Sequence, residues 1–117
     1  MSESLSANFG NPSSIHSLGR ASSQIVRKAR ETVANALEVP SRNIIFTSGA
    51  SEANNQALIG YALANKDKGN HIITTAIEHP SVLNTVQYLH DRYGFDVSFV
   101  KPKADGTFPA SLIEENL

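Results

Sequence analysis

The 117-residue sequence contains no cysteine and no tryptophan. Without a thiol, the chain has no disulfide, no thiolate ligand for a metal and no cysteine nucleophile of its own. It also has no apolar run that approaches the roughly 18 residues of a membrane-spanning helix, so we expect no membrane contact. The first residues lack the apolar core of a secretory signal, and we expect a cytoplasmic location.

Neither sign of charge dominates the sequence. Lys and Arg number 10 and Asp and Glu number 11, which gives a net charge of −1, and the longest basic run is Arg27-Lys28. A nucleic-acid partner would select a basic surface, so this balance argues against one. The four histidines are not spaced as metal ligands, either with one another or with acidic residues, and we expect no metal site.

Short apolar runs alternate with longer segments of helical periodicity along the chain. The predicted strands are residues 44–46, 71–75 and 95–100. The predicted helices start after Ser13-Ser14, at Ser51, after Pro80 and at Pro109. This order indicates an α/β fold with three layers, in which right-handed crossovers make the strands of one sheet parallel. We expect residues 1–12 to be an N-terminal coil and residues 13–117 to form the folded part.

The first three predicted helices each carry an apolar stripe that is expected to face the core. The stripe residues are Ile25, Ala29, Val33 and Leu37 in the first helix, Ala57, Leu58, Tyr61 and Ala62 in the second, and Val82, Val86, Leu89 and Tyr93 in the third. Polar and charged residues between them, such as Arg27, indicate a solvated opposite face.

The segment Thr47-Ser48-Gly49-Ala50-Ser51 separates a predicted buried strand from a predicted helix. In a parallel α/β sheet such a turn directs backbone N–H groups and a helix N-terminus toward one point, where an anion is stabilised. Small side chains allow a phosphate to approach the backbone, and Ser48 and Ser51 add hydroxyl donors. The alternative is an ordinary helix start in which Ser51 is the N-cap and Gly49 supplies an unusual backbone angle.

A second polar loop, Glu78-His79-Pro80-Ser81, follows the next predicted strand. Because the carboxyl ends of parallel strands lie at one edge of the sheet, this loop and the Thr47–Ser51 turn are expected to be neighbours. An imidazole beside an anion site suits a flat, phosphorylated ligand that stacks on His79. The alternative is a surface histidine that merely precedes a helix.

These segments together resemble the NifS/IscS type of cysteine desulfurase, which belongs to the class V aminotransferases of PLP fold type I. The matching segments are Phe9–His16, Ile45–Asn55, His71–Thr75, Glu78–Asn84 and Gly94–Val97. The resemblance implies that residues 13–117 are part of the large PLP-binding domain, a βαβαβ unit with an N-terminal helix. It also implies that the cofactor phosphate is bound at Ala50 and Ser51, where the family usually has Thr at the second position. The family's ring-stacking histidine matches His79.

Other family residues have no counterpart in this sequence. The family lysine that binds pyridoxal 5′-phosphate (PLP) follows Ser-x-His, and none of the five lysines of this chain has that context. The family aspartate that pairs with the pyridine nitrogen and the cysteine that accepts sulfur are not matched either. We therefore expect no catalytic residue here, weak or absent PLP binding, and no activity from this chain alone.

For a complete protein, the resemblance implies conversion of L-cysteine to L-alanine and an enzyme persulfide, which supplies sulfur for Fe–S cluster assembly. Expected partners are L-cysteine, sulfur-acceptor or scaffold proteins, and a second copy or the remainder of the same protein. Two alternatives remain open: a non-catalytic truncated or split subunit that binds a partner, and another class V enzyme such as an aminotransferase or selenocysteine lyase. A Ser-x-His-Lys segment and a cysteine encoded after residue 117 would favour the desulfurase.

Overall fold

The computed structural model describes residues 6–7 and 9–117, which divide into two compact units. The first unit ends at Phe46 and the second runs from Thr47 to Leu117. The predicted coil over residues 1–12 lies partly outside the described range, and within it Ser6 and Ala7 have helical rather than coil backbone. None of the helices in the described range is long and apolar enough to cross a bilayer.

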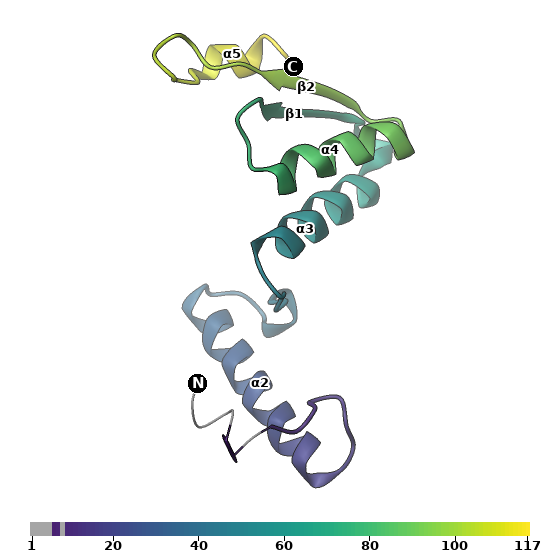
Figure 1. Ribbon diagram of the computed structural model, residues 1–117, viewed down its shortest axis with the longest axis vertical. Helices are drawn as coiled ribbons and strands as arrows, with labels where there is room; N and C mark the ends of the chain where they lie inside the picture. Colours follow the sequence, from purple (N-terminus) through teal and green to yellow (C-terminus); the bar gives the residue numbers. More distant parts are fainter. Residues whose placement is uncertain (1–5, 8) are drawn as a thin grey trace. The chain divides into compact units, whose positions relative to one another are not determined.

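Helix α2, Ser17–Ala36, is the long helix of the first unit (Figure 1). Its N-cap is His16, whose Nδ1 accepts a hydrogen bond from the N–H of Gly19 at 3.3 Å. The predicted Ser13-Ser14 cap is therefore replaced by a histidine three residues before the glycine. A Cβ on Gly19 would lie 2.2 Å from the carbonyl oxygen of Ser14, so only glycine allows the preceding loop to fold this closely onto the helix.

The predicted apolar stripe of α2 is not a core in this unit. Ile25, Val33 and Leu37 are 42%, 39% and 62% exposed, while the buried residues of the helix are Gly19, Ser22 and Ala34. A helix needs a partner surface to bury its stripe. After α2 the described part of this unit contains the short 3₁₀ helix η1, Ser41–Asn43, which is too small to cover the stripe.

The predicted strand at residues 44–46 is wrong, because this segment does not pair in a sheet, although the backbone of Ile44 is extended. Its groups make contacts with α2 instead. Arg30 donates from Nε to the carbonyl oxygen of Ile44 at 3.1 Å, and its guanidinium lies 5.2 Å from the centroid of the Phe46 ring. A strand is stabilised by a neighbouring strand, and the described part of this unit provides none.

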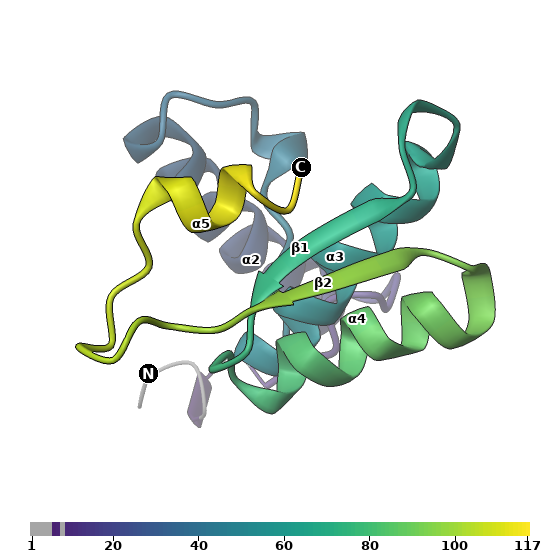
Figure 2. The same cartoon turned by 90° about the horizontal axis from the view of Figure 1, so that it is seen from above.

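The second unit contains the sheet and the helices that cover it. Its elements are α3 (Ala50–Ala64), η2 (Lys66–Lys68), β1 (His71–Thr75), α4 (Pro80–Tyr93), β2 (Asp96–Val100) and α5 (Ala110–Glu114). Strands β1 and β2 pair in parallel, with His71 opposite Asp96 and Thr75 opposite Val100. Figure 2 shows the two strands side by side, with α4 as the connection between them. The predicted α/β fold with a parallel sheet is thus confirmed, although the sheet in the described residues has two strands and not three.

Helix α4 provides the centre of the core of this unit. Val86 and Leu89 of its predicted stripe are 1% and 0% exposed, and they are buried together with Phe95 and Val100. The helix ends at Gly94, whose φ of 70° is in the left-handed region that glycine adopts without strain. Both α3 and α4 lie on the same face of the sheet, as Figure 1 shows. The core therefore holds β1, β2 and the amino end of α4 in fixed relation.

Candidate functional site

The turn before α3 presents free backbone donors. Gly49 is the N-cap residue and makes no side-chain cap, and its φ of 169° is extended backbone that any residue can adopt. The first intrahelical hydrogen bond runs from the N–H of Ala53 to the carbonyl oxygen of Gly49 at 3.1 Å. The N–H groups of Ala50 and Ser51 precede that bond and have no acceptor in the part of the chain that the structure describes. The alternative interpretation, with Ser51 as N-cap and a special angle at Gly49, is wrong, because Ser51 is the second residue of the helix.

Glu52 closes the same turn from inside the helix. Its Oε2 accepts hydrogen bonds from the N–H of Ser48 at 2.6 Å and from the Oγ of Ser48 at 2.7 Å. These bonds stabilise the charged carboxylate and lower the pKa of Glu52, the backbone bond having the larger effect. The carboxylate is thereby tied to Ser48 and leaves the N–H groups of Ala50 and Ser51 to another acceptor.

His79 lies at the start of the next helix. The loop that carries it leaves the carboxyl end of β1, where Ala76 donates to the carbonyl oxygen of Val100 at 2.8 Å. His79 is the N-cap of α4, and its Nδ1 accepts a hydrogen bond from the N–H of Ser81 at 3.1 Å. Since an N–H can only donate, Nδ1 is unprotonated, and the proton of the neutral imidazole is on Nε2.

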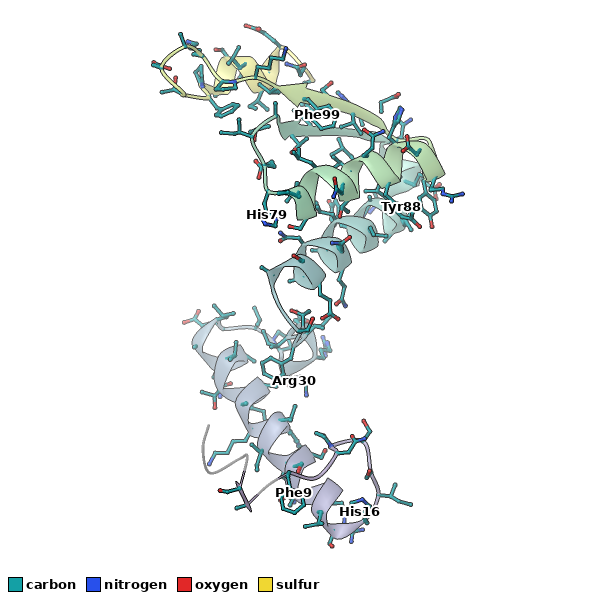
Figure 3. All side chains as sticks on the ribbon, viewed as in Figure 1. Phe9, His16, Arg30, His79, Tyr88 and Phe99 are labelled. Carbon is teal, nitrogen blue, oxygen red and sulfur yellow. The ribbon has the colours of Figure 1, made fainter. Side chains whose placement is uncertain are left out.

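Two hydrogen bonds join the first halves of α3 and α4. Asn54 donates from Nδ2 to the Oγ of Ser81 at 2.9 Å, and Thr85 donates from Oγ1 to the Oδ1 of Asn55 at 2.8 Å. The helices consequently run in the same direction, with their amino ends at the same end of the unit (Figure 1). In Figure 3, His79 lies at this end, beside the start of α3.

The structure thus places the Ala50-Ser51 turn and His79 at the same end of the second unit, by a route that differs from the predicted one. The sequence suggested that two neighbouring strands would place the two loops at one sheet edge. Only the loop of His79 leaves a strand, whereas the Thr47–Ser51 turn is placed by the packing of α3 against α4. Sequence reasoning missed Asn54 and Ser81, although polar residues on a helix face that must pack are a signal that could have revealed them.

Two parallel helices of 15 and 14 residues each direct the positive end of the helix dipole toward this site, beside the negative charge of Glu52. The donors available to an anion are the backbone N–H groups of Ala50 and Ser51 and the exposed hydroxyl of Ser51. The imidazole of His79 adds a flat ring. No group of three or more His, Asp or Glu side chains that could bind a metal ion occurs among the described residues.

A separate apolar pocket of about 560 Å³ lies at the opposite end of α3. It is lined by residues of the predicted α3 stripe, Ala57, Leu58, Tyr61 and Ala62, together with Ile72, Leu89 and Phe95. The stripe therefore faces the sheet as predicted for Leu58, but Tyr61 remains 74% exposed. This pocket has no charged lining residue, and the polar candidate site does not extend into it.

Comparisons with known proteins place the chain in one family. The family model for class V aminotransferases matches residues 1–117, and the chain belongs to this family. Its curated relatives include the cysteine desulfurase IscS 1 of Archaeoglobus fulgidus, 42% identical over 113 residues, and the putative cysteine desulfurase IscS 1 of Bacillus subtilis, 47% identical over 112 residues. These alignments cover 97% and 96% of the chain.

Solved structures show the same relationship. A NifS-like protein aligns with 98% of the chain at a TM-score of 0.81 and 36% identity. A protein solved as SspA in complex with cysteine aligns with 98% of the chain at a TM-score of 0.78 and 39% identity. The chain spans 29% of the length of the first two curated relatives and 31% and 33% of these two solved chains.

Proposed function

We propose that this chain is the phosphate-binding and ring-stacking part of a PLP-dependent cysteine desulfurase. The observation that carries the proposal is the hydrogen bond between Asn54 and Ser81. It joins the first half of α3 to Ser81, whose backbone N–H donates to the imidazole of His79. Membership of the class V aminotransferases and the identity to IscS relatives support this assignment over the other members of the family.

The residues present fit the phosphate of PLP. The N–H groups of Ala50 and Ser51 are the donors that a dianion would accept, and the hydroxyl of Ser51 is exposed next to them. Ser51 retains the hydroxyl of the usual family threonine. The tie between Glu52 and Ser48 holds the nearest carboxylate in place, so that it does not compete for those two N–H groups.

The imidazole of His79 fits the pyridine ring of PLP. Its Nδ1 is occupied by hydrogen bonds from Ser81. These bonds hold one edge of the ring in place and leave both faces of the ring free for stacking. Stacked aromatic pairs typically contribute about 0.5–1.5 kcal/mol beyond the burial of their area. His79 would thus orient the cofactor ring while Ala50 and Ser51 hold its phosphate.

PLP, when bound, supplies an electron sink that allows bonds next to the amino-acid nitrogen to be broken. The substrate that we propose is L-cysteine, in line with the solved neighbour described in complex with cysteine. A desulfurase also needs a thiol that takes the sulfur and a lysine that holds PLP covalently, and this chain has no cysteine. Those two groups would have to come from outside these 117 residues. Sulfur acceptors, a dimeric assembly and a cytoplasmic location are parts of the same proposal.

Pyridoxamine 5′-phosphate tests the binding site directly, because its amine cannot form an imine with an exposed lysine. We expect weak but measurable binding of this compound, and far weaker binding of pyridoxamine, which lacks the phosphate. His79→Ala should weaken binding of pyridoxamine 5′-phosphate roughly three- to tenfold through lost stacking. His71→Ala is the matched control, since His71 is exposed at the amino end of β1 and bonds to Ser98 at 2.8 Å.

Equal affinity for the two compounds, or equal losses in the two histidine variants, would contradict the proposed site. Production of sulfide from L-cysteine and PLP, above the rate with free PLP, would contradict the assignment of the missing thiol and lysine to residues outside this chain. Titrations followed by the fluorescence of the pyridoxamine ring supply the first measurement. A sulfide assay supplies the second.

A further inference from the structure

The side chain of Ser81 links an asparagine on α3 to the imidazole of His79. Ser81 Oγ accepts a hydrogen bond from Asn54 Nδ2 at 2.9 Å and lies 2.9 Å from Nδ1 of His79. Asn54 can only donate from its amide nitrogen, so the hydroxyl uses a lone pair there and keeps its own proton for Nδ1. The three groups form a directed series: Asn54 donates to Ser81, and Ser81 donates to His79.

This series determines how the imidazole is held. Nδ1 receives a hydrogen bond from the Ser81 hydroxyl and a second from the Ser81 N–H at 3.1 Å. Both donors stabilise the tautomer with its proton on Nε2. Asn54 and Ser81 are half-buried between the helices, while His79 is exposed. The orientation of an exposed ring is therefore fixed from a partly covered contact on another helix.

We propose that Asn54 and Ser81 are positioning residues for His79, which fix the orientation of its ring for a cofactor that stacks on it. That a cofactor stacks on His79 rests on the proposed function, whereas the fixed orientation of the His79 ring does not. Neither residue needs to touch the cofactor. Asn54 acts through Ser81, and the connection makes the docking of α3 against α4 a condition for an ordered imidazole.

A neighbouring hydrogen bond between α3 and α4 provides a control that distinguishes the positioning of His79 from the docking of the two helices. Asn55 accepts from the Oγ1 of Thr85 at 2.8 Å, so it also joins α3 to α4 and also comes from the first half of α3. Asn55 makes no hydrogen bond to His79 or to the side chain of Ser81 within the described residues, although Thr85 also donates toward the carbonyl oxygen of Ser81. Asn55→Ala thus removes a bond between the helices, together with the bond from Asn55 Nδ2 to the carbonyl oxygen of Ser51 at 2.7 Å, and leaves the bonds to the imidazole intact.

The experiment uses the full 117-residue chain labelled with ¹⁵N and ¹³C in histidine. Three-bond couplings of His79 report its χ1 angle, and the imidazole ¹⁵N shifts report which nitrogen carries the proton. We expect one rotamer in the unsubstituted chain and in Asn55→Ala. Asn54→Ala and Ser81→Ala should instead show averaging between rotamers and a shift at Nδ1. Ser81→Thr, which keeps the hydroxyl, should restore the single rotamer.

Circular dichroism confirms that each variant is folded before its spectra are compared. Unchanged His79 couplings and shifts in Asn54→Ala and Ser81→Ala would overturn the proposal, and so would equal changes in Asn55→Ala. If Asn54→Ala does not fold, the comparison of Ser81→Ala with Ser81→Thr decides the question alone.

Pyridoxamine 5′-phosphate then tests the consequence for binding. Loss of one hydrogen bond in the series should weaken affinity roughly two- to tenfold in Asn54→Ala and Ser81→Ala. Wild-type affinity that is undetectable, together with ring averaging in the two variants, would support the positioning roles and refute the proposed function. Detectable wild-type affinity with no loss in Asn54→Ala and Ser81→Ala would overturn the positioning roles.

Discussion

Glu52 binds Ser48 through both available donors of the serine, its backbone N–H and its side-chain hydroxyl. Ser48 and Glu52 are four residues apart on either side of the start of α3. Their hydrogen bonds fix the extended turn at Gly49 from which the helix begins. A carboxylate in the first turn also interacts favourably with the positive end of the helix dipole. One side chain therefore both completes the turn and places negative charge next to the proposed phosphate site.

The pH dependence of this turn follows from the lowered pKa of Glu52. The folded carboxyl titrates below its ordinary value of 4.5, first because of the Ser48 N–H and second because of the Ser48 hydroxyl. A depressed pKa gives a stabilisation that is complete above the unfolded pKa and is lost as the pH falls through the folded one. We expect the carboxyl ¹³C signal of Glu52 to titrate below 4.5, and the amides of the turn to lose order over the same acidic range.

Ser48→Ala removes one of the two donors and should raise the pKa of Glu52 toward its ordinary value without restoring it fully, because the N–H remains. Ser51→Ala is the matched control in the same turn, since Ser51 makes no hydrogen bond to Glu52. An unchanged Glu52 titration in Ser48→Ala, or an equal change in Ser51→Ala, would show that these bonds do not control the carboxyl.

The buried side of α4 sets the stability of the second unit. Leu89 is 0% exposed and contacts the sheet side of the core, so Leu89→Ala leaves a cavity that the surrounding residues fill only in part. We expect a loss of about 2–5 kcal/mol in the free energy of unfolding. Leu117→Ala is the matched control, because Leu117 is 88% exposed and its loss should stay within about 0.5 kcal/mol. Urea denaturation measures both, and similar losses for the two variants would contradict the assigned core.

The sequence predicted the second unit well because its signals are local. The α4 stripe with Val86 and Leu89 and the terminating Gly94 follow from periodicity and from one backbone angle. The parallel pairing of the two apolar runs follows from the alternation of strands with helices. The structure has these features at the expected positions. Residues that obey a local rule were therefore placed correctly without knowledge of their neighbours.

The errors concern features that depend on a partner elsewhere in the chain. Residues 44–46 have the composition of a buried strand, but a strand forms only beside another strand. Ile25 and Val33 have helical spacing, yet their exposure depends on a surface that no local pattern specifies. The bond between Asn54 and Ser81 spans 27 residues and was also unforeseen. Ser51 and His79 were suggested by the two polar loops, the assignment of Ala50, Ser51 and His79 to the cofactor came from the resemblance, and their role in cofactor binding remains a proposal.

Two glycines in helices are expected to respond in opposite ways to alanine. Gly60 lies inside α3, and a Cβ there would meet nothing within 4 Å, so Gly60→Ala should stabilise α3 by about 0.5–1 kcal/mol. A Cβ on Gly19 would meet the carbonyl oxygen of Ser14 at 2.2 Å, so Gly19→Ala should destabilise the start of α2 by about 1–3 kcal/mol. Amide hydrogen exchange in each helix measures both changes. Faster exchange in α3 of Gly60→Ala would contradict the open space around Gly60. Unchanged exchange in α2 of Gly19→Ala would contradict the close contact between Gly19 and Ser14.

Self-association should follow from the apolar surface of the second unit. A two-stranded parallel sheet leaves an unpaired edge on each strand, and parallel sheets are normally covered on both faces. Ile77 and Phe99 are 67% and 43% exposed close to the carboxyl ends of these strands. We expect sedimentation at tens of micromolar to show dimers or larger species, and Ile77→Lys combined with Phe99→Lys to shift the chain toward monomer. Gln87→Lys adds a charge at an exposed polar position and should leave association unchanged. A monodisperse wild-type monomer would contradict the prediction, because the exposed edges and side chains would then be stable in water without a partner.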